Sequence, residues 1–294
     1  MPSALSFIAV LKSSIIYNLI LFFVQNFLIL IKFSRLKSWL KLFLKIILKF
    51  LNFFMLYSIA SFKWSVKKKL LWLNLFVSMD ILKNLNNILI QIKNISNEKK
   101  VNLIAISKTF NLDYIRPILD SGHIHFGENR VNEALLKWSN EKKINPNIKI
   151  HLVGKLQSNK IKDALQIFSY IHSLDTEKLA LLLDKEEKKN NIKVKYFIQV
   201  NFGNEVQKSG VSLNKLTEFI SFCRINTSLD IVGLMCIPPL NENASECFKV
   251  LKNLAVENSF SELSMGMSGD YLSAVQNGST FVRIGSAIFG DRTN

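Results

Sequence analysis

The chain has 294 residues, 49% of them hydrophobic, and a formal net charge of +16 at pH 7. Residues 1–78 hold ten Lys, one Arg and no Asp or Glu, so residues 79–294 carry only +5, which argues against nucleic-acid binding by that part. The three cysteines show no CxxC spacing and are odd in number. They indicate neither a disulfide framework nor a zinc knuckle, and predict reduced thiols in a cytoplasmic protein.

Residues 1–78 read as a hydrophobic, basic extension. From Ser13 to Ile31 nineteen residues run without a charge, which is about the length that crosses a bilayer as a helix. Beyond it, Lys37, Lys41, Lys45 and Lys49 recur every four residues, a spacing typical of a basic amphipathic helix on an anionic membrane surface. These patterns predict a membrane anchor.

A different reading of the same extension is favoured. It consists almost wholly of residues with AT-rich codons, whereas "MDILKNLNNILIQIKNI", from Met79, has mixed charge and helical periodicity. If translation starts at Met79, residues 1–78 are an incorrectly assigned start. The predicted organisation is therefore an extension, 1–78, and one folded domain, 79–294, which is cytoplasmic on this reading and membrane-anchored on the other.

After Met79, eight β-rich apolar segments alternate with helical ones. The strand candidates are 101–107, 123–127, 148–154, 170–174, 194–201, 229–236, 262–266 and 280–290. The helix candidates are 111–120, 129–143, 158–168, 176–190, 212–224, 244–257 and 270–277. Eight such units favour an α/β fold with a single (β/α)8 TIM barrel. The alternative, an open α/β sheet, lacks a G-x-G-x-x-G fingerprint.

The first predicted strand, "VNLIAIS", is followed by Lys108. Active sites of barrels lie at the carboxyl ends of the strands, so Lys108 is expected at the mouth. There, a partly desolvated amine loses basicity and becomes able to form a Schiff base with an aldehyde. A solvated lysine in a turn is the alternative. After the second strand, Glu128 and Asn129 are expected either to point toward the mouth or to cap the next helix.

The last two strand ends, "SMGMSGD" and "RIGSAIFG", offer glycines and hydroxyls beside which backbone N–H groups can approach an anion. Barrels commonly bind phosphate after strands seven and eight. A lysine facing a phosphate site indicates pyridoxal 5′-phosphate (PLP) as cofactor. Arg283 would then face the ring nitrogen, and its alternative is an ion pair inside the barrel.

Histidines and one long loop leave further alternatives open. His123, His125 and His151 lie on neighbouring strands, and hydrogen-bonded barrel histidines are favoured over a metal site because no matched carboxylate or cysteine accompanies them. The loop "NFGNEVQKSG", which contains Lys208, is long enough to be a binding loop, and a flexible polar turn is the alternative.

Seven blocks of the sequence, in order and spacing, resemble the pyridoxal phosphate homeostasis proteins, the YggS/PROSC family. They are "LIAISKT", "HFGENRVNEA", "HLVGKLQSNKIK", "IHSLD", "FIQVNFGNEVQKSGV", "GLMCIPP" and "LSMGMSGDYLSAVQNGSTFVRIGSAIFG". The resemblance covers the chain from about Met79 to Gly290. The family has no counterpart for residues 1–78, which supports the interpretation that the start of the chain is wrongly assigned.

The resemblance implies a fold-type III PLP-binding barrel related to the N-terminal domain of alanine racemase, with Lys108 holding PLP as an internal aldimine. It implies that Ser268, Gly285 and Ser286 hold the phosphate, although the family usually has Thr at Ser286. Further implied roles are pocket lining by Asn129 and Met265, contact of Arg283 with the pyridine nitrogen, and transient acceptance of PLP by Lys208.

The expected function is intracellular PLP homeostasis, in which the protein buffers PLP or delivers it, with apo PLP-dependent enzymes as expected recipients. Alanine racemase needs a second base, a tyrosine from an additional domain. The chain ends soon after Gly290 and shows no obvious second base, so a non-catalytic carrier, a monomer, is expected. The alternative is a small PLP-dependent amino-acid racemase.

Overall fold

The computed structural model describes residues 78–96, 99–203, 209–239 and 242–290, all within the compact unit Asn74–Asn294. The predictions for residues 1–77 and for Lys208 lie outside the described residues. Within those four ranges, no helix is both long and apolar enough to cross a membrane.

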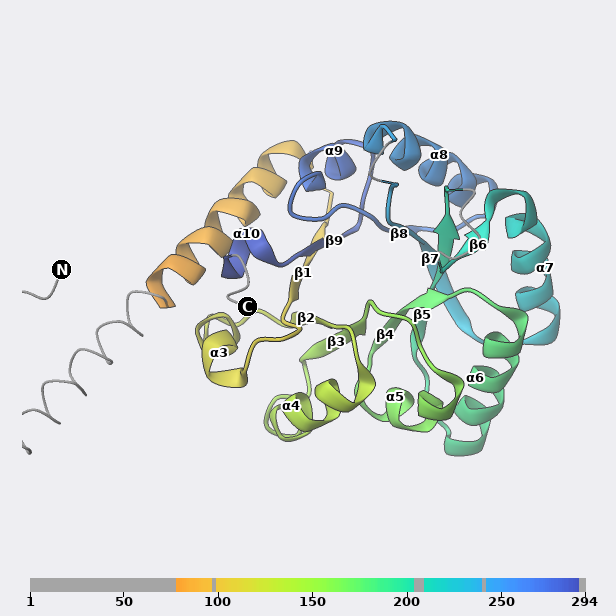
Figure 1. Ribbon diagram of the computed structural model, residues 1–294, viewed down its shortest axis with the longest axis horizontal. Helices are drawn as coiled ribbons and strands as arrows, with labels where there is room; N and C mark the ends of the chain where they lie inside the picture. The colour runs from red at the N-terminus through yellow and green to blue at the C-terminus, as the bar shows by residue number, and fades with distance from the viewer. Residues whose placement is uncertain (1–77, 97–98, 204–208, 240–241, 291–294) are drawn as a thin grey trace, which may run out of the picture. The chain divides into compact units, whose positions relative to one another are not determined.

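Parallel strands form a closed barrel, which confirms the predicted (β/α)8 fold over the open sheet (Figure 1). Each strand pairs with the next one around the barrel, and the β1–β9 and β4–β5 pairings complete the circle, while the short β6 adds to the edge of β5. The strands are β1 Asn102–Ile106, β2 His125–Glu128, β3 Lys149–Leu152, β4 Tyr170–Leu174, β5 Lys195–Asn201, β6 Val211–Ser212, β7 Asp230–Cys236, β8 Glu262–Ser264 and β9 Phe281–Ile284.

Helices surround the strands, as Figure 1 shows, and each predicted helix is present with ends shifted by a few residues. The α-helices are α3 Leu112–Asp120, α4 Val131–Ile144, α5 Ile161–Ile167, α6 Glu177–Asn190, α7 Leu216–Asn226, α8 Ala244–Glu257, α9 Tyr271–Gln276 and α10 Ser286–Phe289. Two single 3₁₀ turns, η2 Ser158–Lys160 and η3 Leu213–Lys215, precede α5 and α7. The predicted strand 280–290 is shorter than expected, because the chain leaves the sheet after Ile284 and turns into α10.

The helix 78–95 lies beside α9 and α10 in Figure 1. Its buried side chains are Ile81, Leu85, Ile88 and Ile92, a spacing of three or four residues that places them on one face. The amide of Asn84 donates to the carbonyl of Ile288 over 3.2 Å. The helical periodicity read from Met79 onward is therefore confirmed.

Apolar side chains form two clusters because successive residues of a strand face opposite sides. One cluster lies inside the barrel and consists of Ile104, Phe197, Met235 and Phe281. A much larger cluster, which includes Leu103 and Ala105, fills the space between strands and helices. In β9 the same alternation places Arg283 on the interior side with Phe281, two residues nearer the carboxyl end of the strand.

Candidate functional site

Lys108 lies in the turn that leads from β1 to α3, and it is half-buried. β1 runs between β2 and β9, with Ile106 aligned to Gly127 and Ala105 aligned to Ile284. Two residues beyond Ile106, Lys108 therefore lies at the strand ends that carry Asn129 on one side and Gly285 and Ser286 on the other. The structure places the lysine at the carboxyl end of the barrel, as predicted.

A buried polar cluster holds the start of this turn. One carboxylate oxygen of Glu128, Oε1, accepts from the Ser107 hydroxyl at 2.7 Å, from the Lys137 ammonium at 2.9 Å and from the Trp138 indole N–H at 2.9 Å. Lys137 also donates to the Ser107 carbonyl oxygen at 2.8 Å. Thr109, which directly follows Lys108, has a φ of 72°, in the left-handed region that a β-branched residue rarely adopts.

The position of Glu128 corrects the sequence prediction. Its side chain is fully buried against α4 and neither points toward the mouth nor caps that helix, whose N-cap residue is Arg130. The reason is strand alternation: Glu128 follows Gly127, so it lies on the same side as Phe126, whose ring packs on Trp138 with centroids 4.6 Å apart. Its partners therefore come from α4 and from Ser107.

Two backbone N–H groups converge on one point at the end of β9. The amides of Gly285 and Ala287 both donate to the hydroxyl oxygen of Ser268, each at 3.3 Å. The preceding turn needs glycine at position 266, because its φ is +94° and an added Cβ would lie 2.6 Å from the Cβ of Ala274. Ser268 and Gly285 are thus brought together as predicted, and Ser286, which is exposed, begins α10 beside them.

Arg283 is buried inside the barrel, with 4% of its surface exposed. Its Nη1 donates to the carbonyl and hydroxyl oxygens of Ser264, at 2.7 and 2.8 Å, and its Nη2 donates to the carbonyl of Cys236 at 2.8 Å. Within the described ranges it has no ion-pair partner, so the alternative of an interior ion pair is wrong. Burial lowers the pKa of Arg283 from its ordinary value.

Asn129 and Met265 differ in their surroundings. Asn129 is exposed just after β2, and its carbonyl lies against Gly154, two residues beyond the end of β3, where an added Cβ would come within 2.3 Å of the oxygen. Met265 is fully buried in the large cluster between strands and helices, and its backbone N–H and carbonyl bond to Phe281 and Ser279. Pocket lining by these two residues stays a prediction.

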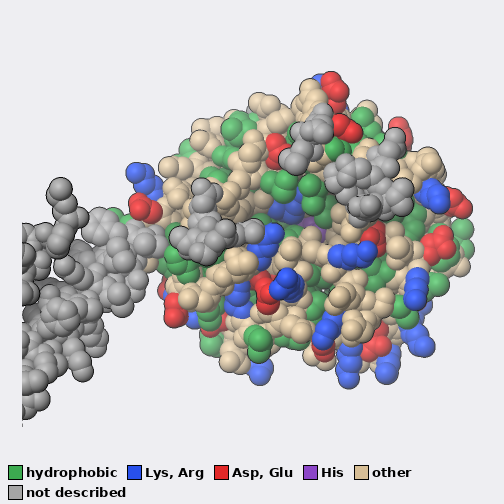
Figure 2. Space-filling model, in the orientation of Figure 1, with side chains coloured by type: hydrophobic (Ala, Val, Ile, Leu, Met, Phe, Trp, Pro, Cys, Tyr) green, Lys and Arg blue, Asp and Glu red, His purple; other side chains and the backbone are tan. Residues whose placement is uncertain are grey.

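The histidines of the barrel hydrogen-bond to one another, as favoured over a metal site. His125 and His151 lie 2.9 Å apart at their ring nitrogens. The described part of the chain contains no group of three or more metal-ligating side chains. Sequence reasoning missed His172, which joins this set from β4, because its partner Ser264 lies 92 residues away in the chain. Figure 2 shows basic and histidine side chains near the centre of the face that it presents.

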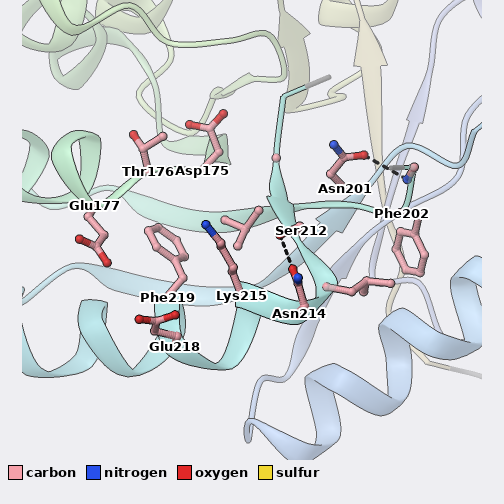
Figure 3. A pocket seen from close by; sticks show the side chains of 14 residues that line it. Asp175, Thr176, Glu177, Asn201, Phe202, Ser212, Asn214, Lys215, Glu218 and Phe219 are labelled. Atoms are coloured by element: carbon pink, nitrogen blue, oxygen red, sulfur yellow. Dashed lines mark hydrogen bonds between the residues drawn. The ribbon is translucent and has the colours of Figure 1, made fainter. Parts of the chain in front are cut away.

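A separate cavity of about 900 Å³ lies at the carboxyl ends of β4 and β5 (Figure 3). Its lining includes Asp175, Asn201 and Lys215, and Gly203 and Gly210, which flank the loop containing Lys208 in sequence. Partial burial raises the pKa of the Asp175 carboxyl. Of the residues predicted to hold PLP, those that the structure describes do not line this cavity.

Comparison with known proteins identifies the family. The sequence profile of "Alanine racemase, N-terminal domain" matches residues 82–293. A pyridoxal phosphate homeostasis protein of Aquifex aeolicus is 37% identical over 204 residues, which are 66% of this chain and 89% of that protein. One of Schizosaccharomyces pombe is 33% identical over 213 residues, 69% of this chain and 89% of that protein.

Solved structures agree with these matches. PipY of Synechococcus elongatus, solved with PLP bound, is 34% identical and superposes with a TM-score of 0.61 over 68% of this chain and 98% of its own. An alanine racemase of Clostridium difficile is 13% identical and superposes with a TM-score of 0.56 over 73% of this chain and 57% of its own. At this identity the match shows the shared fold alone. The chain therefore belongs to the alanine racemase N-terminal domain family, among the pyridoxal phosphate homeostasis proteins.

Proposed function

We propose that this protein binds PLP for intracellular PLP homeostasis, holding it through Lys108 and buffering it or delivering it to apo PLP-dependent enzymes. The observation that carries the proposal is the meeting of three strand ends. These ends carry a half-buried lysine after β1, the Ser268 hydroxyl after β8, and two amides after β9 that converge on this hydroxyl, while the Arg283 guanidinium is buried in the barrel interior. The names of the relatives and the PLP-bound PipY structure point to the same ligand.

The residues present fit PLP. The amides of Gly285 and Ala287 converge on a serine hydroxyl at 3.3 Å, a long distance for such bonds, and a phosphate oxygen would be a stronger acceptor there. Ser268, Gly285 and Ser286 would hold the phosphate, and Lys108 the aldehyde end. PLP supplies an aldehyde that condenses reversibly with a primary amine and a ring that can withdraw electrons. Asn129 and Met265 would line the pocket, and Lys208 would accept PLP in transit.

Arg283 favours a carrier over a catalyst. A guanidinium has only donors, so it cannot accept a hydrogen bond from a protonated ring nitrogen and would instead donate to an unprotonated one. A ring without that proton withdraws electrons weakly. A second base is also missing among the described tyrosines. Three of them already donate hydrogen bonds: Tyr114 to the carbonyl of Phe289, Tyr196 to Glu187 and Tyr271 to Gln91. The fourth, Tyr170, begins β4 and so lies at the opposite end of its strand from the mouth.

The compartment and assembly state belong to the same proposal. All three cysteines are free and buried, and burial raises the pKa of Cys236 to about 12, as expected for inert thiols kept in the reducing cytoplasm. We therefore place the protein in the cytoplasm, acting as a monomer whose partners are PLP and apo-enzymes, with no role for nucleic acid. Racemisation of amino acids is the competing function.

A titration with PLP, followed by absorbance, tests the proposal on the full chain. Lys108→Ala should weaken binding by roughly a hundredfold, or about 2.7 kcal/mol, since it removes the covalent attachment. The exposed Lys178→Ala is the matched control and should bind like the unmodified chain. Loaded protein should reactivate an apo PLP-enzyme and leave L-alanine optically pure. Equal binding by both variants would refute the lysine assignment, and racemisation of L-alanine would favour the competing function.

A further inference from the structure

A line of hydrogen bonds crosses the barrel interior behind Arg283. Ser264 Oγ lies 2.8 Å from Arg283 Nη1 on one side and 2.8 Å from His172 Nδ1 on the other. The other ring nitrogen of His172, Nε2, lies 2.9 Å from His151 Nδ1. The line ends where His151 Nε2 lies 2.9 Å from His125 Nδ1. These residues come from β9, β8, β4, β3 and β2 in turn. Ser264, His172 and His151 are completely buried, and only His125, at the far end, is partly accessible.

Arg283 fixes the direction in which every bond of this line donates. A guanidinium cannot accept, so Ser264 Oγ accepts from Arg283. If Ser264 Oγ also accepted from His172 Nδ1, its buried O–H would have no acceptor among these groups, so the O–H donates to His172 Nδ1. A neutral imidazole has one donor and one acceptor. His172 must then donate through Nε2 to His151 Nδ1, and His151 through Nε2 to His125. Reversing any bond would leave a buried donor or acceptor unpaired.

Aromatic packing keeps the two buried rings in place. The ring of His151 stacks on Tyr170 with centroids 4.5 Å apart and planes 9° apart. The ring of His172 stacks on Phe197 with centroids 4.4 Å apart and planes 19° apart. Burial lowers the pKa of both histidines well below the ordinary value, and that of His125 to about 4, so all three are neutral at pH 7. Neutral rings are what the one-way pattern requires.

We propose that Ser264, His172, His151 and His125 are positioning residues that act as a one-way relay to hold the Arg283 guanidinium as a fixed donor inside the barrel. The relay rests on the proposed function in one respect: PLP is the group whose ring nitrogen Arg283 would face. Held in this way, Arg283 would present its N–H groups to the ring in one orientation and with its full set of protons. Chains of aligned hydrogen bonds polarise one another, so the relay strengthens the contact of Arg283 with Ser264.

The first test uses the full chain without PLP, so it does not depend on PLP binding. The chain has only four histidines, and long-range ¹⁵N–¹H correlation spectra of histidine-labelled protein report the tautomer of each ring. At pH 7 the relay predicts neutral rings protonated at Nε2 for His125, His151 and His172. A ring protonated at Nδ1, or an imidazolium, at His151 or His172 would overturn the proposal.

The second test measures the effect on the ligand. Ser264→Ala removes one oxygen from the interior and should weaken PLP binding about tenfold, or 1.4 kcal/mol, while Ser264→Thr, which keeps the hydroxyl, should restore it. His123→Gln is the matched control, since His123 bonds the backbone carbonyl of His125 and lies outside the relay. In Ser264→Ala the ¹⁵N spectrum should also lose the single tautomer at His172. Unchanged affinity together with an unchanged His172 tautomer would contradict the relay. Absence of PLP binding by the unmodified chain would instead refute the proposed function.

Discussion

At the scale of single residues, Lys108 owes its place to groups that surround the turn rather than to the lysine itself. Ser107, just before it, bonds through both its hydroxyl and its carbonyl to a buried ion pair between Glu128 and Lys137. The side chain of Lys137 is only 11% exposed and that of Glu128 is fully buried. Breaking one partner of such a pair leaves the other charge uncompensated.

Lys137→Ala is therefore expected to lower the free energy of unfolding by about 3–5 kcal/mol, because Glu128 would keep its buried charge without a cation. Urea denaturation of the full chain measures this change. The matched control is Arg130→Ala, whose ion pair with Glu133 is exposed, with side chains 78% and 40% accessible, and should change stability by less than about 1 kcal/mol. Equal losses in the two variants would show that the buried pair does not hold the turn.

Sequence alone could predict some site residues and not others. Lys108 directly follows an apolar strand segment, so its place at the mouth could be read from that strand end. Gly285 lay inside the predicted strand 280–290, so the sequence pointed to its small residues and hydroxyls but not to the residue at which the strand ends. The side on which Glu128 lies depends on where β2 ends, one residue later than predicted. The role of His172 depends on a serine in a distant strand, and no local pattern reveals that pairing.

At the scale of elements, the alternation of β-rich and helical segments was enough to predict a barrel. Parallel strands buried on both faces read as short apolar runs, and each run here is separated from the next by a helical segment. The end of β9 was predicted too late, at 290 instead of Ile284, since "RIGSAIFG" continues the apolar run of the strand and no proline or polar cluster marks where the strand stops. Register between strands, which brings Ser268 to Gly285, also lay beyond local pattern.

The helix 78–95 should contribute strongly to the stability of the barrel. Leu85→Ala removes a side chain that is 2% exposed and is expected to cost about 2–5 kcal/mol of unfolding free energy. Leu89→Ala, one turn later and 37% exposed, is the matched control and should cost less than about 1 kcal/mol. Thermal or urea unfolding of both variants checks this, and similar values would mean that the helix does not pack as a core element.

At the scale of the whole molecule, the barrel separates two tasks. The carboxyl ends of β1, β8 and β9 gather the groups that we assign to PLP, and the interior behind them is filled by the histidine relay and the cluster of Ile104, Phe197, Met235 and Phe281. This packed interior leaves PLP only the mouth. An accessible mouth with a reversible lysine attachment suits a protein that takes up a reactive aldehyde and releases it again.

The most direct measurement is to treat the full chain with PLP, reduce it with borohydride, digest it and locate the modified lysine by mass spectrometry. Reduction makes the bond between a lysine amine and the PLP aldehyde permanent, so the labelled peptide identifies the residue that holds PLP. We expect a single dominant label on Lys108. Folded protein with no label on Lys108, or with label spread over exposed lysines such as Lys178, would contradict it.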